Sequence, residues 1–146
     1  MDLQILALQA VMADQLGGET VHHALGIDPS ERQAGAIKAS QKPTEAAKVV
    51  SQWRWLIIDE ISMISASFLA EIDMRLRDLI STAQPYKMRS DNLSRPFGGL
   101  NVLLIGDFWQ LDPPQGVSLA SLPVDYIRRA RKFDPSAPTA HGQALL

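Results

Sequence analysis

The chain has 146 residues, which is the length of a single domain. Its composition, 46% apolar and 21% charged, is typical of a folded globular protein and argues against intrinsic disorder. The net charge of −2 excludes binding to nucleic acid by overall charge alone, and the lack of cysteine excludes a disulfide framework and a thiolate zinc site. No apolar run is long enough to span a bilayer and no secretory signal is visible, so we expect an intracellular protein with no membrane partner.

Apolar stretches typical of strands alternate along the chain with stretches that have helical spacing. Such alternation predicts an α/β fold built on a parallel sheet with right-handed crossovers. Gly17 and Gly18 are suited to ending the first helix, and Thr44 is suited to capping a later one. In chain order we expect a strand at 3–8, a helix at 9–16, a segment of open type at 20–27, a loop at 28–43, a helix at 44–52, a strand at 54–59, a helix at 65–82, a strand at 101–105 and a basic helix at 124–133.

The two later strands and the helix between them have the clearest patterns. The strands at 54–59 and 101–105 are continuous apolar runs, which are typical of central parallel strands covered on both faces. In the helix at 65–82, acidic and basic residues four apart, such as Asp73 and Arg77, are expected to pair on the solvent face. The opposite face is expected to be a buried stripe of Phe68, Leu69, Ile72, Leu76, Leu79 and Ile80.

Polar side chains follow both of these strands, at the edge of a parallel sheet where ligands bind. Asp59 and Glu60 follow the first strand, and Asp107 and Gln110 follow the second after Gly106. In nucleotide hydrolases, an acid in the first position holds Mg²⁺ beside the phosphates, and the next acid can orient or deprotonate the attacking water. An amide such as that of Gln110 can contact a γ-phosphate and a water together. The pattern therefore indicates a site for nucleotide hydrolysis.

Four short segments resemble one family. They resemble motifs II and III, and the segment after motif Ia, of the petite-integration-frequency (Pif) DNA helicases of superfamily one, which translocate 5′ to 3′ on single-stranded DNA. The pair formed by D-E-I-S-M and F-G-G…G-D-F-x-Q-L is highly specific. The matching segments are Gly18-Glu19-Thr20-Val21-His22, Asp59-Glu60-Ile61-Ser62-Met63, Arg95-Pro96-Phe97-Gly98-Gly99 and Gly106-Asp107-Phe108-Trp109-Gln110-Leu111.

The resemblance implies a RecA-like P-loop NTPase fold with ATP as the substrate and Mg²⁺ as the cofactor. By resemblance, Asp59 is the Mg²⁺ ligand, Glu60 is the catalytic base and Gln110 is the γ-phosphate sensor that couples the ATP state to the grip on DNA. Asp107 corresponds to the acid of motif III and supports the nucleotide site.

The resemblance also implies single-stranded and duplex DNA as partners, and work in DNA repair, recombination and telomere maintenance in the nucleus or mitochondrion. Thr20 and His22 resemble residues near the DNA path. Trp109 can stack on a nucleobase or pack beneath the neighbouring loop, and the sequence leaves both open.

The chain also departs from the family pattern. Residues 7–13 lack the threonine and glycine of motif Ia, and Asp112 precedes the Pro113-Pro114 pair. No G-x-x-x-x-G-K-[ST] phosphate loop occurs, and no second motor domain with its arginine finger follows. We therefore expect residues 1–133 to be an incomplete first motor domain that lacks the first strand and the phosphate loop, with 134–146 as a tail or the start of the next segment. The isolated chain is expected to be inactive.

Two other functions stay open at this point. One is a catalytically inactive remnant of the same fold that still binds single-stranded DNA, which the missing phosphate loop favours. The other is a metal-dependent nuclease that uses Asp59, Glu60, Asp107 and Asp112. The nuclease lacks a histidine or lysine base beside these acids and leaves Gln110 unexplained.

Overall fold

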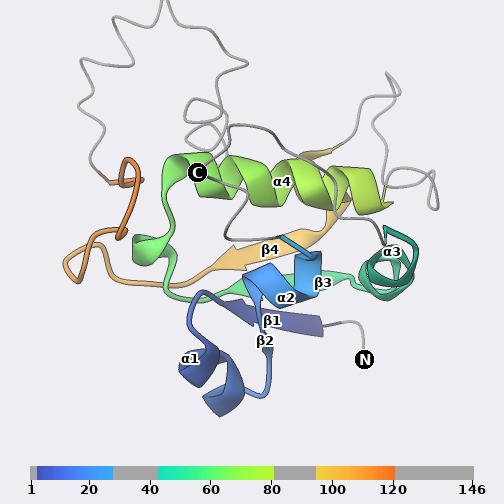
Figure 1. Ribbon diagram of the computed structural model, residues 1–146, viewed down its shortest axis with the longest axis horizontal. Helices are drawn as coiled ribbons and strands as arrows, with labels where there is room; N and C mark the ends of the chain where they lie inside the picture. Colours follow the sequence, from blue (N-terminus) through green and yellow to red (C-terminus); the bar gives the residue numbers. More distant parts are fainter. Residues whose placement is uncertain (1–2, 28–42, 81–94, 121–146) are drawn as a thin grey trace, which may run out of the picture.

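The computed structural model describes residues 3–27, 43–80 and 95–120, in which a parallel sheet carries helices on its faces (Figure 1). The four strands lie in the order β2-β1-β3-β4, so the predicted parallel α/β architecture is confirmed. The elements are β1 (Leu3–Ala7), α1 (Ala10–Gln15), β2 (Glu19–Thr20), α2 (Val21–Leu25), α3 (Pro43–Ser51), β3 (Trp55–Ile58), the 3₁₀ turn η2 (Ile61–Met63), α4 (Ala66–Ile80), the 3₁₀ turn η4 (Pro96–Gly99) and β4 (Asn101–Leu104).

One face of the sheet packs against helices, and α4 lies across it (Figure 1). Leu6, Leu56 and Ile58, on neighbouring strands, are fully buried there. The alternate residues point to the opposite face, where Trp55 is 53% exposed and Leu103 is 50% exposed. The prediction that both strands are covered on both faces is therefore wrong for the described residues. The described helices bury only one face of β3 and β4, and β4 lies at the edge of the described sheet.

Helix α4 confirms the predicted apolar stripe, since all six of its expected residues are buried. The expected exposure of Asp73 is wrong. Its side chain is fully buried, where it accepts the backbone N–H of Phe97 and lies 2.7 Å from Arg77 Nε. Asp73 falls on the same helical face as Leu69, Ile72 and Leu76, and η4 covers that face. A charge placed within an apolar stripe is therefore buried together with the stripe.

The other elements follow the predicted order with small shifts. Gly17, with φ +66°, ends α1 as expected, whereas α3 begins at Pro43, so Thr44 lies within the helix and does not precede it. The open segment at 20–27 contains the end of β2 and the short helix α2. The predicted loop at 28–43 lies almost wholly outside the described residues, and the basic helix at 124–133 and the segment 134–146 lie entirely outside them. Within the described part of the chain, no helix is both long enough and apolar enough to cross a membrane.

Candidate functional site

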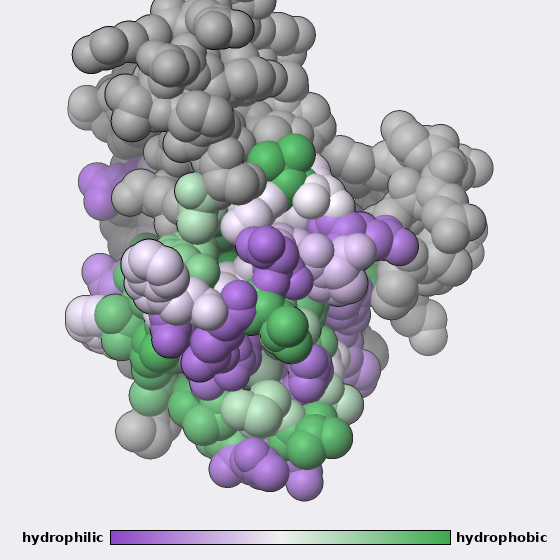
Figure 2. All heavy atoms as spheres, turned by 90° about the vertical axis from the view of Figure 1, so that its left-hand side faces the viewer, coloured by the Kyte–Doolittle hydropathy of each residue, from purple (hydrophilic) through white to green (hydrophobic). Residues whose placement is uncertain are grey.

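The carboxyl ends of all four strands meet at one edge of the sheet, because every pairing is parallel. Figure 2 looks onto this edge, where hydrophilic side chains gather across the middle of the face between apolar ones. Thr20 ends β2, Gln9 follows β1, Asp59 follows β3 and Gly106 follows β4. The sheet thus brings the predicted site segments to one side of the molecule.

The segments that follow β3 and β4 are in direct contact. The backbone N–H of Ile105 donates to Ile58 O at 2.9 Å, and the N–H of Ile61 donates to Ile105 O at 2.9 Å. A Cβ atom on Gly106 would lie 2.8 Å from Ile61 N, closer than side-chain atoms pack, so only glycine fits here. The loop that carries Gln110 therefore starts against the segment that carries Glu60.

Asp59 and Glu60 are half-buried and held by backbone contacts. The N–H of Asp59 continues the sheet by donating to Leu6 O at 2.9 Å, and Asp59 Oδ1 accepts the N–H of Glu60 at 2.9 Å. Glu60 has φ +57°, a left-handed conformation that is rare for residues other than glycine and is common at functional sites. Among the described residues, no group hydrogen-bonds the other Asp59 oxygen or the Glu60 carboxylate. Two acids therefore have free oxygens at this edge, and a backbone N–H holds one of them, Asp59.

These free oxygens fit a Mg²⁺ ion shared with a nucleotide. Mg²⁺ takes oxygen ligands and is usually held by one or two carboxylates together with substrate phosphates and water. In the described ranges, no three histidine, aspartate or glutamate side chains form a group that could hold a metal. The arrangement thus fits a cation held jointly with phosphates. The nuclease alternative would need several of the acids Asp59, Glu60, Asp107 and Asp112 around one metal, and these described acids do not form such a group.

The loop after β4 folds as a turn around Asp107. Asp107 Oδ1 accepts the N–H of Trp109 at 2.9 Å, and Asp107 O accepts the N–H of Gln110 at 3.0 Å. Asp107, Trp109 and Gln110 are all exposed, and the exposed fraction of Trp109 is 96%. The Trp109 side chain therefore does not pack beneath the described part of the neighbouring loop, and its stacking on a nucleobase stays a prediction. The turn presents its indole and the Gln110 amide to solvent.

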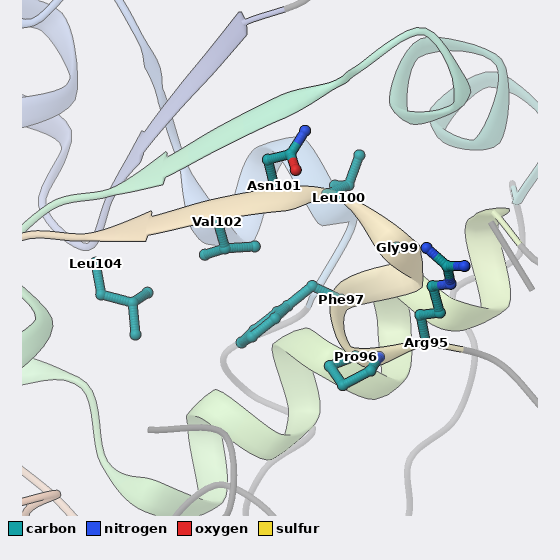
Figure 3. A pocket seen from close by; sticks show the side chains of 8 residues that line it. All are labelled: Arg95, Pro96, Phe97, Gly99, Leu100, Asn101, Val102 and Leu104. Atoms are coloured by element: carbon teal, nitrogen blue, oxygen red, sulfur yellow. The ribbon is translucent and has the colours of Figure 1, made fainter. Parts of the chain in front are cut away.

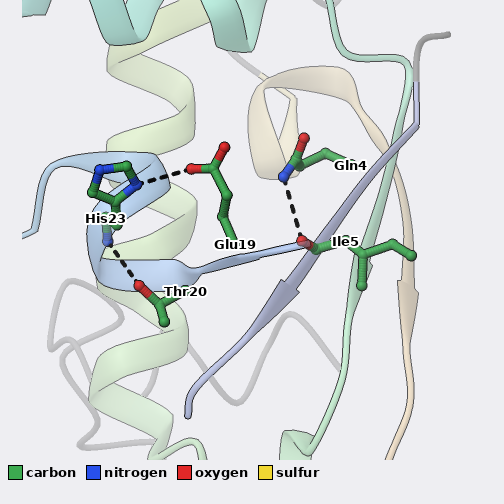
Figure 4. Close-up of polar contacts among 5 residues, drawn as sticks. All are labelled: Gln4, Ile5, Glu19, Thr20 and His23. Atoms are coloured by element: carbon green, nitrogen blue, oxygen red, sulfur yellow. Dashed lines mark hydrogen bonds and ion pairs between the residues drawn. The ribbon is translucent and has the colours of Figure 1, made fainter. Parts of the chain in front are cut away.

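Thr20 and His22 lie at the same edge, but β1 and β3 separate them from β4. Thr20 Oγ1 accepts the N–H of His23 at 3.3 Å and so caps α2 (Figure 4). The ring of His22 stacks on Phe68, with centroids 5.0 Å apart and an interplanar angle of 23°. His23 Nδ1 lies 3.0 Å from Glu19 Oε2 (Figure 4). Thr20 and His22, two of the three predicted DNA contacts, are thus half-buried and also make contacts within the protein.

A cavity of about 420 Å³ lies elsewhere, beside η4 and β4 (Figure 3). Its lining runs from Arg95 to Leu104 and includes none of the predicted site residues. It therefore adds nothing to the site at the carboxyl edge.

The sequence analysis does not predict the contacts of two residues that join segments of the fold, Gln9 at the carboxyl edge and Asp73 beneath η4. Gln9, two residues after the end of β1, donates from Nε2 to Met63 Sδ at 3.5 Å and so joins the chain after β1 to the segment after β3. Its signal is a polar residue at the end of an apolar strand. Asp73 holds the F-G-G segment, and its signal is an acid whose spacing places it within the apolar stripe of α4.

Comparisons with known proteins agree with this arrangement. The model of the family "PIF1-like helicase" matches residues 5–118. The ATP-dependent DNA helicase PIF6 of Trypanosoma brucei brucei is 35% identical over 112 residues, which cover 75% of this chain and 13% of that protein. The chain therefore spans only a small part of the length of this relative.

Two solved structures share the fold. The Pif1 of Bacteroides sp in complex with ADP-AlF4 is 25% identical, with a TM-score of 0.56 over 90% of this chain and 26% of that chain. The Bacteroides Pif1 bound to ssDNA is 24% identical, with a TM-score of 0.58 over 90% of this chain and 27% of that chain, and this second likeness shows the fold alone. Together with the parallel sheet, these matches confirm the RecA-like fold class.

Proposed function

This chain belongs to the PIF1-like helicase family, and we propose that it forms the central part of the first motor domain of an ATP-dependent, 5′-to-3′ DNA helicase. The contact between the segments after β3 and β4 supports this proposal most strongly. It starts the loop of Gln110 against the segment of Asp59 and Glu60 at the ligand-binding edge of the sheet.

Each residue at this edge has a role that its contacts support. Asp59, whose Oδ1 is held by the Glu60 N–H, would use its free oxygen to hold Mg²⁺, which neutralises charge on the β- and γ-phosphates. The Glu60 carboxylate would accept a proton from the attacking water. Gln110 would contact the γ-phosphate, and Asp107 would support the nucleotide site by shaping the turn before Gln110.

DNA would pass over the exposed part of the same edge. Trp109 offers a fully presented aromatic face, and base stacking on such a face is tolerant of sequence. Thr20 and His22 would border the DNA path from the far side of the edge, through α2, which they help to position. The partners would be single-stranded and duplex DNA.

The wider role and the domain boundaries rest on the family likeness. We propose action in DNA repair, recombination and telomere maintenance, in the nucleus or the mitochondrion. The motor-domain part would extend over residues 1–133, with 134–146 as a tail or the beginning of a further segment.

We further propose that residues 1–146 alone do not turn over ATP. The sequence contains no Gly-Lys pair and hence no phosphate loop of the G-K-[ST] type, which supplies the main backbone and cationic contacts to phosphates. An arginine finger from another part of a motor contributes about 10³–10⁵-fold in rate. Asp59 and Glu60 would therefore act only beside these two parts.

The test is a segment-swapped helicase, in which residues 5–118 of this chain replace the matching segment of Bacteroides Pif1. This protein keeps the phosphate loop and the second motor domain of the relative. It is expected to hydrolyse ATP when single-stranded DNA is present. Glu60→Gln is expected to lower kcat for hydrolysis by about 10²–10⁴-fold and to leave binding of ATP and DNA intact, because only the proton acceptor is lost.

The matched control is Glu19→Gln, the same chemical change at an exposed position of the same edge, which should leave hydrolysis unchanged. Normal turnover by the Glu60→Gln variant would contradict the role of the base. A folded segment-swapped helicase that binds single-stranded DNA and never hydrolyses ATP would instead support the inactive remnant.

A further inference from the structure

The loop at 106–116, called here the β4 loop, is fastened at both ends to one segment of chain. At its start, Ile105 O accepts the N–H of Ile61, as described above. At its end, Val117 O accepts the N–H of Ala66 at 2.9 Å, and Ser118 pairs with Ser65 in an antiparallel bridge. Both ends of the β4 loop are thus bonded to the segment 61–66, which begins directly after Glu60.

The second end is a close contact between Ser65 and Gly116. A Cβ atom on Gly116 would lie 2.8 Å from Ser65 Cβ and 3.0 Å from Ser65 Oγ, and Gly116 has φ +87°. Ser65 is itself fixed, since it is buried, its Oγ accepts the N–H of Phe68 at 3.3 Å and it lies 3.2 Å from Ser67 Oγ. Gly116 therefore rests on a rigid point at the start of α4.

Between these two ends, the described hydrogen bonds of the β4 loop are internal to it. They run from the N–H groups of Trp109 and Gln110 to Asp107. The exposed side chains of Phe108, Trp109 and Leu111 do not anchor the loop in the core. Its two ends therefore set its position relative to Glu60.

From this geometry we infer that Ser65 is a positioning residue for the β4 loop, acting through its contact with Gly116. The loop and the segment 61–66 then move as one unit, so a displacement at Glu60 reaches Gln110 and Trp109. The roles of Gln110 and Trp109 in this loop depend on the proposed function, whereas the anchoring of the loop does not. A loop that loses one anchor gains conformational freedom and no longer holds its side chains in one place.

Hydrogen exchange of the 146-residue chain tests the anchoring. The N–H of Ile61 reports on the first end of the loop, and the N–H of Ala66 reports on the second. In the unchanged chain we expect both amides to be protected. In Gly116→Ala, the clash with Ser65 is expected to lower the protection of Ala66 about ten-fold or more, with little change at Ile61.

Two further variants separate this contact from backbone strain. Gly17→Ala places alanine at a similar φ of +66° with nothing within 4 Å, and it should leave Ala66 protected. Ser65→Gly combined with Gly116→Ala removes the clashing atoms, and glycine still serves as a helix cap, so protection of Ala66 should partly return. Unchanged protection in Gly116→Ala, an unprotected Ala66 in the unchanged chain, or no recovery in the double variant would overturn the inference.

A second readout, in the segment-swapped helicase, distinguishes positioning from general stability. Gly116→Ala is expected to weaken ATP affinity about ten-fold and leave ADP affinity unchanged, because only the contact of Gln110 with the γ-phosphate is displaced. Gln110→Ala should give the same pattern. Equal weakening of ATP and ADP, or no weakening of either, would overturn the positioning role. Failure of the unchanged segment-swapped helicase to hydrolyse ATP would count against the proposed function alone, because hydrogen exchange needs no nucleotide.

Discussion

At the scale of single residues, the burial of one acidic side chain differs most from what the sequence predicts. Asp73 is fully buried between α4 and η4, where it binds both the N–H of Phe97 and the guanidinium of Arg77. A buried acid is tolerated when every oxygen has a partner, and it is costly when a partner is lost. Asp73 thus fastens the F-G-G segment, from which β4 starts, to the helix beneath it.

Replacing Asp73 should therefore destabilise the fold. Asp73→Ala leaves the Phe97 N–H and the Arg77 side chain without this acceptor, and we expect a loss of about 3 kcal/mol in the free energy of unfolding. Urea unfolding measures it. The control Asp14→Ala, at an exposed position of α1, should change stability by no more than about 0.5 kcal/mol. Equal effects of the two substitutions would contradict the anchoring role of Asp73.

Replacing the exposed Trp109 should change DNA binding and leave the stability of the fold unchanged. Trp109→Ala should leave the unfolding midpoint unchanged and weaken binding of a labelled single strand to the segment-swapped helicase by about 1–3 kcal/mol, the usual range for a stacked base. Fluorescence anisotropy measures the affinity. Leu111→Ala, which also truncates an exposed apolar side chain of the β4 loop, is the matched control. An unchanged affinity in Trp109→Ala would remove this residue from the DNA path.

Among the elements, η4 and α4 pack so closely that glycine is required between them. A Cβ on Gly98 would lie 2.7 Å from Ile80 Cδ1 and 2.9 Å from Leu76 O. Gly98 and the preceding Phe97 both have positive φ, so the backbone turns sharply over the helix before β4 begins. This contact places the whole of β4, and with it the β4 loop, relative to the rest of the sheet.

Gly98→Ala should therefore lower the free energy of unfolding by more than its backbone conformation alone explains. Overpacking of this kind costs about 1–3 kcal/mol, and alanine at positive φ adds about 1–2 kcal/mol. Gly17→Ala, with nearly the same φ and open space around it, measures the backbone contribution separately. The difference between the two free energies of unfolding should reflect the contact with α4, and no difference would argue against it.

At the scale of the whole molecule, the parallel sheet gathers the acids, the β4 loop and the start of α2 at one edge. Parallel pairing alone accomplishes this, because strands that run the same way end on the same side. The cavity beside η4 and the exposed apolar face with Trp55 and Leu103 lie apart from this edge. Among the described residues, the candidate site is thus an edge built from loops, apart from the cavity beside η4.

An edge without a phosphate loop should bind nucleotide weakly. Titration of the 146-residue chain with Mg²⁺ and ATP is expected to show no saturation up to about 1 mM, which corresponds to a binding free energy weaker than about −4 kcal/mol. Calorimetry provides the measurement. Micromolar affinity together with steady hydrolysis would show that the chain holds phosphates by contacts other than those proposed.

Local patterns predict the strands β1, β3 and β4, the stripe of α4 and the acids that follow β3, because each depends on residues close in sequence. They do not predict β2, which has only two residues. The burial of Asp73 and the contact of Ser65 with Gly116 depend on segments distant in sequence that meet only after folding. The apolar runs also do not predict that one face of the sheet is exposed. An apolar run indicates which residues can be buried, and it does not indicate which helices cover them. The roles of Asp59, Glu60 and Gln110 stay predictions.

The central claim is that Glu60 and Gln110 serve one reacting phosphate, and a double-mutant cycle on kcat tests it most directly. In the segment-swapped helicase, Glu60→Gln and Gln110→Ala should each lower kcat by about 10²–10⁴-fold. Residues that act as a unit are strongly non-additive, so the double variant should be no slower than the slower single variant. A double variant whose loss equals the product of the two single losses would show that the residues act independently, and would contradict the account.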